Sequence, residues 1–215
     1  MSDLKLYIGN KNYSSWSFRP WIGMKVLGAE FTEELIPFDM AGGNPKFKTF
    51  SPTGKVPVLV DGNQTIFESL AILDHLSRKF PNNGFWPSDE KAHSHAMAIS
   101  CEMLGGFSAL RRQCPMNMRR PIVKMEQDEA LQKDVSRIEK LWSDCLAQSG
   151  GPFLFRSFTS ADAMFAPVVN RFEVYKLSEN QTVLKYMENM KSLDAWQEWE
   201  TAGKAEPWIV DVDEA

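Results

Sequence analysis

Residues 54–76 read GKVPVLVDGNQTIFESLAILDHL, and this segment decides most of the fold. Two apolar runs, 56–60 and 65–67, flank Asp61-Gly62, a dipeptide that favours a tight hairpin turn. From residue 69 to residue 80 the leucines and a phenylalanine recur at helical spacing, which predicts an amphipathic helix. The segment is therefore predicted to be a hairpin that leads directly into a helix.

The residues before this segment predict a strand, a helix and a second strand. Residues 4–8 alternate apolar and polar positions, as a half-buried strand does, and 31–37 form another strand-like run. Between them, 18–27 show helical spacing, with Pro20 expected in the first turn, where a missing N–H costs little. A helical crossover makes the first two strands parallel. The predicted order is βαβ, an irregular helix, then ββα.

After residue 81 the pattern changes. Residues 82–87 are rich in Pro, Asn and Gly and are the best candidate for a linker. Strand signals then nearly vanish, and helices are predicted over 93–110, 126–148, 162–177 and 182–190. We therefore predict an α/β domain over 1–81 and an all-helical domain over 88–215.

Composition excludes several classes of function. The 215 residues include 24 Lys and Arg against 28 Asp and Glu, and a net charge of −4 gives no broad footprint for nucleic acid. We expect no membrane span and no signal peptide, which makes the cytoplasm the expected location. The cysteines Cys101, Cys114 and Cys145 show no CxxC pair and no zinc spacing. They are expected to be reduced, buried and without a metal.

The motif GKVPVL, residues 54–59, places Pro57 at the start of a strand. One interpretation is an ordinary proline at a strand start. The other is a cis proline, which leaves the backbone of Val56 free to pair with an extended peptide.

The motif FES, residues 67–69, stands where the helix after the hairpin begins. Free N–H groups and the positive end of the helix dipole can hold a carboxylate there, and the Ser69 hydroxyl can assist. Glu68 is placed to receive an ammonium group, so the pair suits the α-amino acid end of a ligand. The alternative is simple N-capping by Ser69, with Glu68 solvated.

The motif YSSWSFRPW, residues 13–21, places serines at a junction between loop and helix. A hydroxyl there can donate to a thiolate, and the helix N-terminus favours the negative charge. N-capping is again the alternative.

Together, in this order, the three motifs resemble the glutathione S-transferase family, and the long segment 102–120 resembles bacterial proteins of that type. The resemblance implies a thioredoxin-like N-terminal domain followed by an all-α domain, glutathione as cosubstrate without a metal, and a cytoplasmic homodimer that detoxifies small electrophiles. It implies that Val56 holds the cysteinyl part of glutathione and that Glu68 and Ser69 hold the γ-glutamyl end. Lys55 is expected to contact the glycyl carboxylate.

The serine pair is most similar to that of the zeta class, and this similarity implies that Ser14, or Ser15 in its place, stabilises the thiolate. Trp16 stands where that class has cysteine. The zeta arginine that holds a substrate carboxylate has no match, because Arg171 is offset from it. Alternatives to conjugation are a maleylacetoacetate isomerase-like reaction and a non-enzymatic binding protein. Disulfide exchange by the protein itself is disfavoured because no cysteine lies at this helix.

Two further features complete the predictions. Arg111 and Arg112 are expected near the end of the first long helix of the second domain, where either could hold an acidic group or remain solvated. The segment TSAD, residues 159–162, resembles the capping box of the family. There Thr159 caps a buried helix and Asp162 reaches back, which is a structural role.

Overall fold

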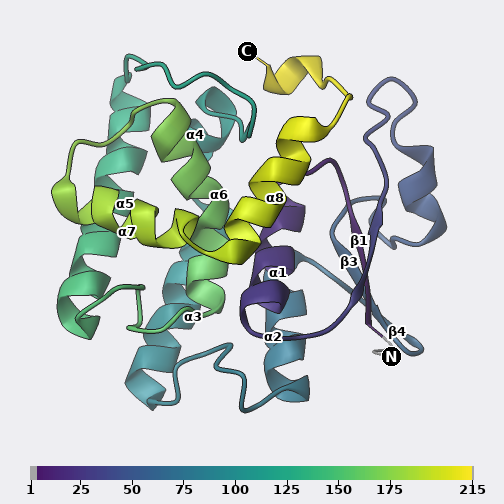
Figure 1. The fold of residues 1–215 in the computed structure, drawn as a ribbon, viewed down its shortest axis with the longest axis horizontal. Helices are drawn as coiled ribbons and strands as arrows, with labels where there is room; N and C mark the ends of the chain where they lie inside the picture. Colours follow the sequence, from purple (N-terminus) through teal and green to yellow (C-terminus); the bar gives the residue numbers. More distant parts are fainter. Residues whose placement is uncertain (1–3, 215) are drawn as a thin grey trace.

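The computed structural model describes residues 4–214. Figure 1 shows a small sheet at one end and a larger helical part at the other. The strands are β1 (Leu4–Ile8), β2 (Thr32–Leu35), β3 (Val58–Asp61) and β4 (Gln64–Phe67). The helices are α1 (Ser15–Val26), α2 (Ser69–Lys79), α3 (Glu90–Gly105), α4 (Ser108–Gln113), α5 (Glu129–Ser149), α6 (Ser160–Val174), α7 (Gln181–Lys191) and α8 (Asp194–Ala205), with short 3-10 helices at Pro45–Thr49 and Asp211–Asp213.

The sheet has the order β2-β1-β3-β4, and it contains the parallel first pair and the hairpin that the sequence predicts. Strands β1 and β2 are parallel, whereas β3 is antiparallel to both β1 and β4. Gly62 lies in the hairpin turn with a φ of 58°, a conformation that glycine adopts without strain. Leu4, Leu6 and Ile8 of β1 point into the core, as the alternation predicts.

Helix α1 begins earlier than predicted, and this corrects the place of Pro20. The helix starts at Ser15, so Pro20 lies in its interior and not in the first turn. Proline lacks the N–H that would bond the carbonyl of Trp16, four residues earlier. The hydroxyl of Ser69 donates to that carbonyl at 2.7 Å. A side chain from α2 thus replaces the missing helical hydrogen bond and ties α2 to α1.

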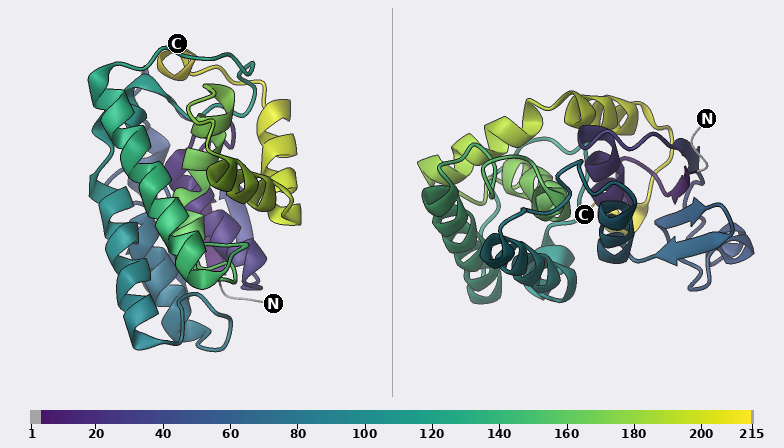
Figure 2. Two further views of the ribbon diagram at one scale, coloured as in Figure 1. Left: turned by 90° about the vertical axis from the view of Figure 1, so that its left-hand side faces the viewer. Right: turned by 90° about the horizontal axis from the view of Figure 1, so that it is seen from below.

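In the helical part the predicted helix over 93–110 is divided in two. Helix α3 ends at Gly105, and Phe107 takes a left-handed conformation (φ 58°) before α4 begins. Helix α8 was not predicted. Helix α6 runs through the middle and packs on both α1 and α3, which explains why nearly all of its residues are buried. Figure 2 shows this helical part set apart from the strands in its right-hand view.

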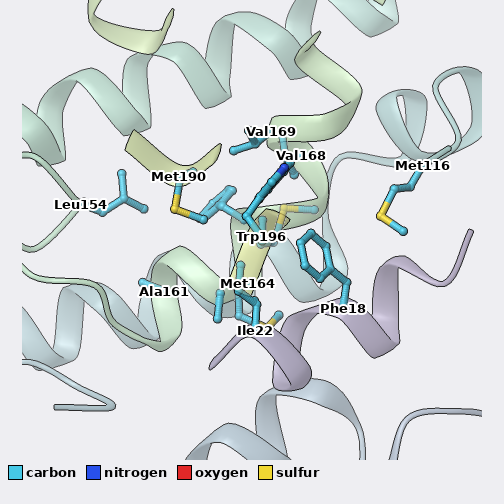
Figure 3. Close-up of a cluster of buried hydrophobic side chains, with 14 of the residues drawn as sticks. Phe18, Ile22, Met116, Leu154, Ala161, Met164, Val168, Val169, Met190 and Trp196 are labelled. Carbon is cyan, nitrogen blue, oxygen red and sulfur yellow. The ribbon is translucent and has the colours of Figure 1, made fainter. Parts of the chain in front are cut away.

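Aromatic side chains join the two parts of the chain. Phe18 and Trp21 of α1 contact Trp199 of α8, with ring centroids 4.7 and 5.0 Å apart. Figure 3 shows Phe18 beside Met164 and Trp196 in the same cluster. The core is therefore continuous from α1 to α8. The predicted domain limits, 1–81 and 88–215 with a linker at 82–87, remain a prediction, and residues 1–3 and 215 lie outside the described residues.

The capping box before α6 is formed as predicted. Thr159 is the N-cap, and its backbone N–H donates to the Asp162 carboxylate at 2.9 Å. Asp162 also accepts the backbone N–H of Leu154 at 3.0 Å and the hydroxyl of Tyr186 at 3.1 Å. A fully buried carboxylate with these donors anchors α6 to the preceding loop and to α7.

None of the helices described between residues 4 and 214 is long and apolar enough to cross a membrane.

Candidate functional site

Ser14 caps α1, and its hydroxyl is part of a short chain of hydrogen bonds. Its oxygen accepts the N–H of Ser17 at 3.4 Å, and its hydroxyl donates to the Ser17 hydroxyl oxygen at 2.8 Å. Ser17 in turn accepts the N–H of Gly9 from the end of β1 at 3.1 Å. This chain fixes Ser14 at the positive end of the helix dipole while its side chain faces a cleft.

Ser15 is the first residue of α1 and faces the same cleft. Its oxygen accepts a hydrogen bond from Nη2 of Arg171 at 3.4 Å, which connects α1 to α6. No acceptor for the Ser15 hydroxyl hydrogen lies among residues 4–214, so that hydrogen is available to a ligand.

The peptide bond between Val56 and Pro57 is cis, in agreement with the second interpretation of this motif. Val56 lies just outside the ladder of β3, and its backbone N–H and carbonyl have no hydrogen-bond partner in the described part of the chain. Ser51 holds the preceding turn, since its hydroxyl donates to the carbonyl of Lys55 at 2.7 Å and accepts its N–H at 3.0 Å. Val56, with its unpaired backbone groups, thus lies beside the cleft at the end of a turn that Ser51 holds in place.

Glu68 and Ser69 lie at the start of α2. Glu68 is exposed and has a φ of 70°, a left-handed conformation that costs energy for a residue other than glycine and is typical of functional sites. No side chain caps α2, which leaves its first N–H groups without a capping partner. Ser69 is the first helical residue and not the N-cap, so the capping alternative for Ser69 is wrong. Its hydroxyl hydrogen is already used by the carbonyl of Trp16.

All six predicted site residues line two adjoining hollows. The first, here called the Glu68 hollow, has a volume of about 150 Å³ and includes Lys55, Val56, Glu68 and Ser69. The second, here called the serine hollow, has a volume of about 360 Å³ and is lined by Tyr13, Ser14, Ser15, Trp16, Phe38, Met40, Asn44, Phe47, Gly54, Lys55, Val56, Arg111, Pro115, Met116, Arg171, Val210 and Asp213. The two hollows share Trp16, Lys55 and Val56, so they form one continuous cleft.

The serine hollow has two walls of different origin. The N-terminal wall consists of Ser14, Ser15, Lys55 and Val56. The helical wall consists of Arg111, Pro115, Met116 and Arg171, from α4, the loop after it and α6.

Arg111 and Arg112 lie on α4 and not on the first long helix, which corrects their predicted position. Arg111 is half-buried in the helical wall, with its guanidinium 4.8 Å from the ring centroid of Trp16. It donates to the carbonyls of Met103 and Gly106, the latter at 2.9 Å. Arg112 is exposed and outside both hollows. Of the two, only Arg111 reaches the cleft.

The prediction missed Arg171 as a site residue. Its side chain is buried and lines the serine hollow, and its Nε and Nη1 have no hydrogen-bond partner within residues 4–214. Burial, together with the charge of Arg111, lowers the pKa of Arg171 to about 10. The signal available in the sequence was an arginine that follows the apolar run 163–169 of a predicted helix, since arginine is seldom fully buried without a partner.

The C-terminal segment closes one side of the serine hollow through Val210 and Asp213. Glu206 anchors this segment, because its carboxylate accepts the N–H groups of Lys11 at 2.6 Å and Asn12 at 3.2 Å. Contact with the loop before α1 therefore sets where the chain end lies.

Other predicted features lie away from the cleft. Cys114 and Cys145 are buried, and burial raises their thiol pKa values to about 11 and about 12, so neither is a ready nucleophile. Cys101 is exposed, contrary to the prediction for it. The part of the chain that the structure describes contains no group of three His, Cys, Asp or Glu side chains placed to hold a metal.

A larger hollow of about 1040 Å³ lies between the start of α3 and the end of α5. Trp86, His93, His95 and Phe155 are among its lining residues. It contains none of the six predicted site residues.

The fold is that of a thioredoxin-like domain followed by a helical domain, with a cleft between them. Residues 13–79 match the family model described as "Glutathione S-transferase, N-terminal domain". Among curated relatives, glutathione S-transferases T1 and Z1 of Arabidopsis thaliana are each 27% identical to this chain. The T1 match covers 92% of this chain and 83% of the relative, and the Z1 match covers 87% and 89%. These matches support a member of the glutathione S-transferase family, as the sequence motifs predict.

Solved structures agree on the fold. A glutathione transferase homologue from Burkholderia with bound glutathione superposes with a TM-score of 0.71 at 21% identity, covering 96% of this chain and all of the other. Ure2p in complex with glutathione superposes with a TM-score of 0.69 at 18% identity, covering 92% and 98%. A probable maleylacetoacetate isomerase of Caenorhabditis elegans is 30% identical over about half of each chain.

Proposed function

We propose that this chain is a glutathione transferase that binds glutathione along the two hollows and adds its thiolate to a small electrophile in the serine hollow. The observation that carries this proposal is the unpaired backbone of Val56, which lies between the uncapped start of α2 and the serines at the start of α1. A short extended peptide with a carboxylate at one end and a thiol in the middle fits this order of groups.

The γ-glutamyl end of glutathione belongs in the Glu68 hollow. The free N–H groups of α2 and its dipole would bind the carboxylate. The exposed Glu68 would accept the ammonium group. Ser69 contributes its backbone N–H and an acceptor oxygen, since its hydroxyl hydrogen bonds the carbonyl of Trp16.

The cysteinyl part pairs with the backbone N–H and carbonyl of Val56, as a strand added at the edge would. The exposed Lys55, which lines both hollows, would pair with the glycyl carboxylate as a point charge.

Ser14 is proposed as the thiolate donor. In the present arrangement its hydroxyl hydrogen points to Ser17. A hydroxyl turns freely, so Ser17 can donate to Ser14 and release the Ser14 hydrogen for the thiolate sulfur. Each unit by which this lowers the thiol pKa from its usual value near 8.5 is worth about 1.36 kcal/mol.

The reaction needs no resident cofactor in this proposal. The thiol proton leaves to solvent, and the thiolate sulfur donates an electron pair to the electrophilic carbon. A carbon–sulfur bond forms, and either a leaving group departs with its bonding pair or the adduct takes up a proton.

Calorimetry of glutathione binding, followed by conjugation assays with a panel of electrophiles, tests the proposal. We expect binding at or below the millimolar range, saturable and competitive with S-methylglutathione. Absence of any glutathione binding would overturn it. Binding without conjugation of any electrophile would support instead a non-enzymatic protein on this fold.

The isomerase alternative has one specific observation in its favour, the similarity to the probable isomerase of Caenorhabditis elegans. Isomerisation regenerates glutathione, so a cis–trans substrate such as maleylacetoacetate would turn over without consuming the thiol. Thiol titration during turnover separates this reaction from conjugation.

We further propose a homodimer that works in the cytoplasm in detoxification. These three statements rest on the family resemblance, and sedimentation of the purified protein tests the first of them.

A further inference from the structure

Arg171 has unused hydrogen-bonding capacity in a buried place. Its side chain is 5% exposed, and only its Nη2 has a hydrogen-bond partner, the hydroxyl oxygen of Ser15. Its Nε and Nη1 are unpaired among the described residues. Burying a guanidinium costs free energy unless its donors are paired, so an Arg in this state calls for an explanation outside the protein chain itself.

The surroundings of Arg171 are positive. Arg111 lies in the same wall, and Arg19, which is fully buried, has its guanidinium 4.2 Å from the ring centroid of Trp16. Within residues 4–214, no carboxylate comes within 4.0 Å of a nitrogen of any of these three guanidinium groups. Two of these arginines, Arg111 and Arg171, line the cleft, and Arg19 lies buried behind Trp16; all three lack a counter-ion within that distance.

Two acidic residues act on these arginines through their charge, but neither forms an ion pair with them. Asp213, at the rim of the serine hollow, acts on Arg171 through its charge without forming an ion pair. Asp134 acts on Arg111 in the same way, while its carboxylate accepts the N–H groups of Ala109 and Leu110. With a pKa of about 10, Arg171 stays protonated at neutral pH.

We propose that Arg171, assisted by Arg111 and the free hydroxyl hydrogen of Ser15, forms a subsite for a carboxylate on the second substrate. A planar guanidinium offers forks of adjacent N–H donors that match the two oxygens of a carboxylate. The bond from Nη2 to Ser15 is long, at 3.4 Å, so Nη2 can join the unpaired Nη1 in such a fork. The subsite lies in the helical wall, opposite Lys55 and Val56, so it recognises the electrophile and not glutathione. This inference rests on the proposed function for the identity of the second ligand.

Binding of a matched pair of unreactive probes tests the subsite directly. With glutathione saturating, we expect para-methylbenzoate to bind about tenfold to a hundredfold more tightly than its methyl ester. Arg171→Met should remove this preference, and Arg171→Lys should restore part of it. Arg112→Met, which removes an exposed arginine from the same region, should leave the preference intact. Equal binding of acid and ester by the wild type, or a preference retained in Arg171→Met, would overturn the inference.

Conjugation of para-(chloromethyl)benzoate and its methyl ester gives a kinetic readout. After division by the uncatalysed rates, the ratio of kcat/KM for acid over ester should fall about tenfold or more in Arg171→Met, mainly through KM. Glutathione affinity measured on the same variant identifies the source of the carboxylate. If Arg171→Met weakens glutathione binding and not para-methylbenzoate binding, Arg171 holds a carboxylate of glutathione and the inference is wrong.

The two proposals fail in different ways. Loss of the proposed function shows as no glutathione binding, even if para-methylbenzoate still binds in preference to its ester. Loss of the subsite shows as normal glutathione binding with no preference for the acid. Thermal unfolding of both Arg171 variants tests whether they are folded. We expect Arg171→Met to fold, because it replaces an unpaired buried charge by an apolar side chain.

Discussion

The N-terminal wall and the helical wall meet in one cleft but are built by different means. In the N-terminal wall, Ser14, Val56 and their neighbours act from helix starts and a turn, where backbone groups are already unpaired. In the helical wall, Arg111 and Arg171 come from two helices and owe their positions to packing. The first wall is suited to a ligand that is always the same. The second wall is suited to determining which second substrate is accepted.

From this comparison we predict that the stability of the helical part depends strongly on Asp162, the buried carboxylate that anchors α6. Asp162→Ala leaves the N–H groups of Leu154 and Thr159 and the hydroxyl of Tyr186 without an acceptor. We expect the free energy of unfolding to fall by about 3 kcal/mol, measured by urea denaturation. Asp144→Ala, which breaks an exposed pair with Lys140, is the control and should change it by less than about 0.5 kcal/mol.

The pH dependence of stability provides a second test of the role of Asp162. Burial raises the pKa of Asp162 to about 6 from 3.8, although its hydrogen-bond donors oppose the rise. The folded state therefore holds the proton more tightly than the unfolded state. The stability of the wild type relative to Asp162→Asn should be greatest near pH 4 and should decline by up to about 1.4 kcal/mol per unit as pH rises to 6. An increase over that range would mean that the donors outweigh burial.

In the N-terminal wall the largest effect is expected at Ser14. Ser14→Ala should lower kcat about a hundredfold and raise the pKa of bound glutathione, followed by the ultraviolet absorbance of the thiolate. Ser14→Thr keeps the hydroxyl and the cap and should retain most of the activity. If Ser15→Ala proves more harmful than Ser14→Ala, then Ser15 is the thiolate donor.

A smaller effect is expected at Glu68. Glu68→Gln keeps the size of the side chain but removes the charge that would meet the ammonium group, so glutathione affinity should fall about tenfold by calorimetry. The exposed Glu90, in the first turn of α3, supplies the matched control. An equal loss in Glu90→Gln would point to a general charge effect and not to a contact.

The smallest effect concerns the bond that joins the two helix starts of the N-terminal wall. Ser69→Ala removes the donor to the carbonyl of Trp16 and should cost about 1 kcal/mol of stability without ligand. In a Pro20→Ala background the restored N–H can bond that carbonyl, so the same change should cost close to nothing. Additive effects in this double-mutant cycle would show that Pro20 is not why Ser69 donates there.

Much of the N-terminal wall could be predicted from sequence because its signals are local. The strand alternation at 4–8, the Asp61-Gly62 turn and the helix after residue 69 depend on neighbours within a few positions. All six predicted site residues line the cleft for the same reason, since each belongs to a motif at an element boundary.

The predictions from sequence are wrong where contacts between residues far apart in the chain determine the local structure. Pro20 was expected in a first turn because an interior proline loses a hydrogen bond, and the loss is made good only by Ser69, which is 49 positions away in the chain. The predicted helix over 93–110 breaks before α4, where Phe107 takes a left-handed conformation that its side-chain pattern does not signal.

The sequence by itself determined the order of strands and helices up to residue 80, the place of the motif around Val56 and Pro57, and the serines at the start of α1, because each depends on short-range geometry and backbone preference. Only the tertiary structure decided that Arg171 lines the same cleft and has buried, unpaired donors, and that Arg111 reaches the cleft while Arg112 does not. The direction of a charged side chain within a packed helical bundle is set by which neighbours exclude water from it. That information lies in contacts between residues far apart in the chain.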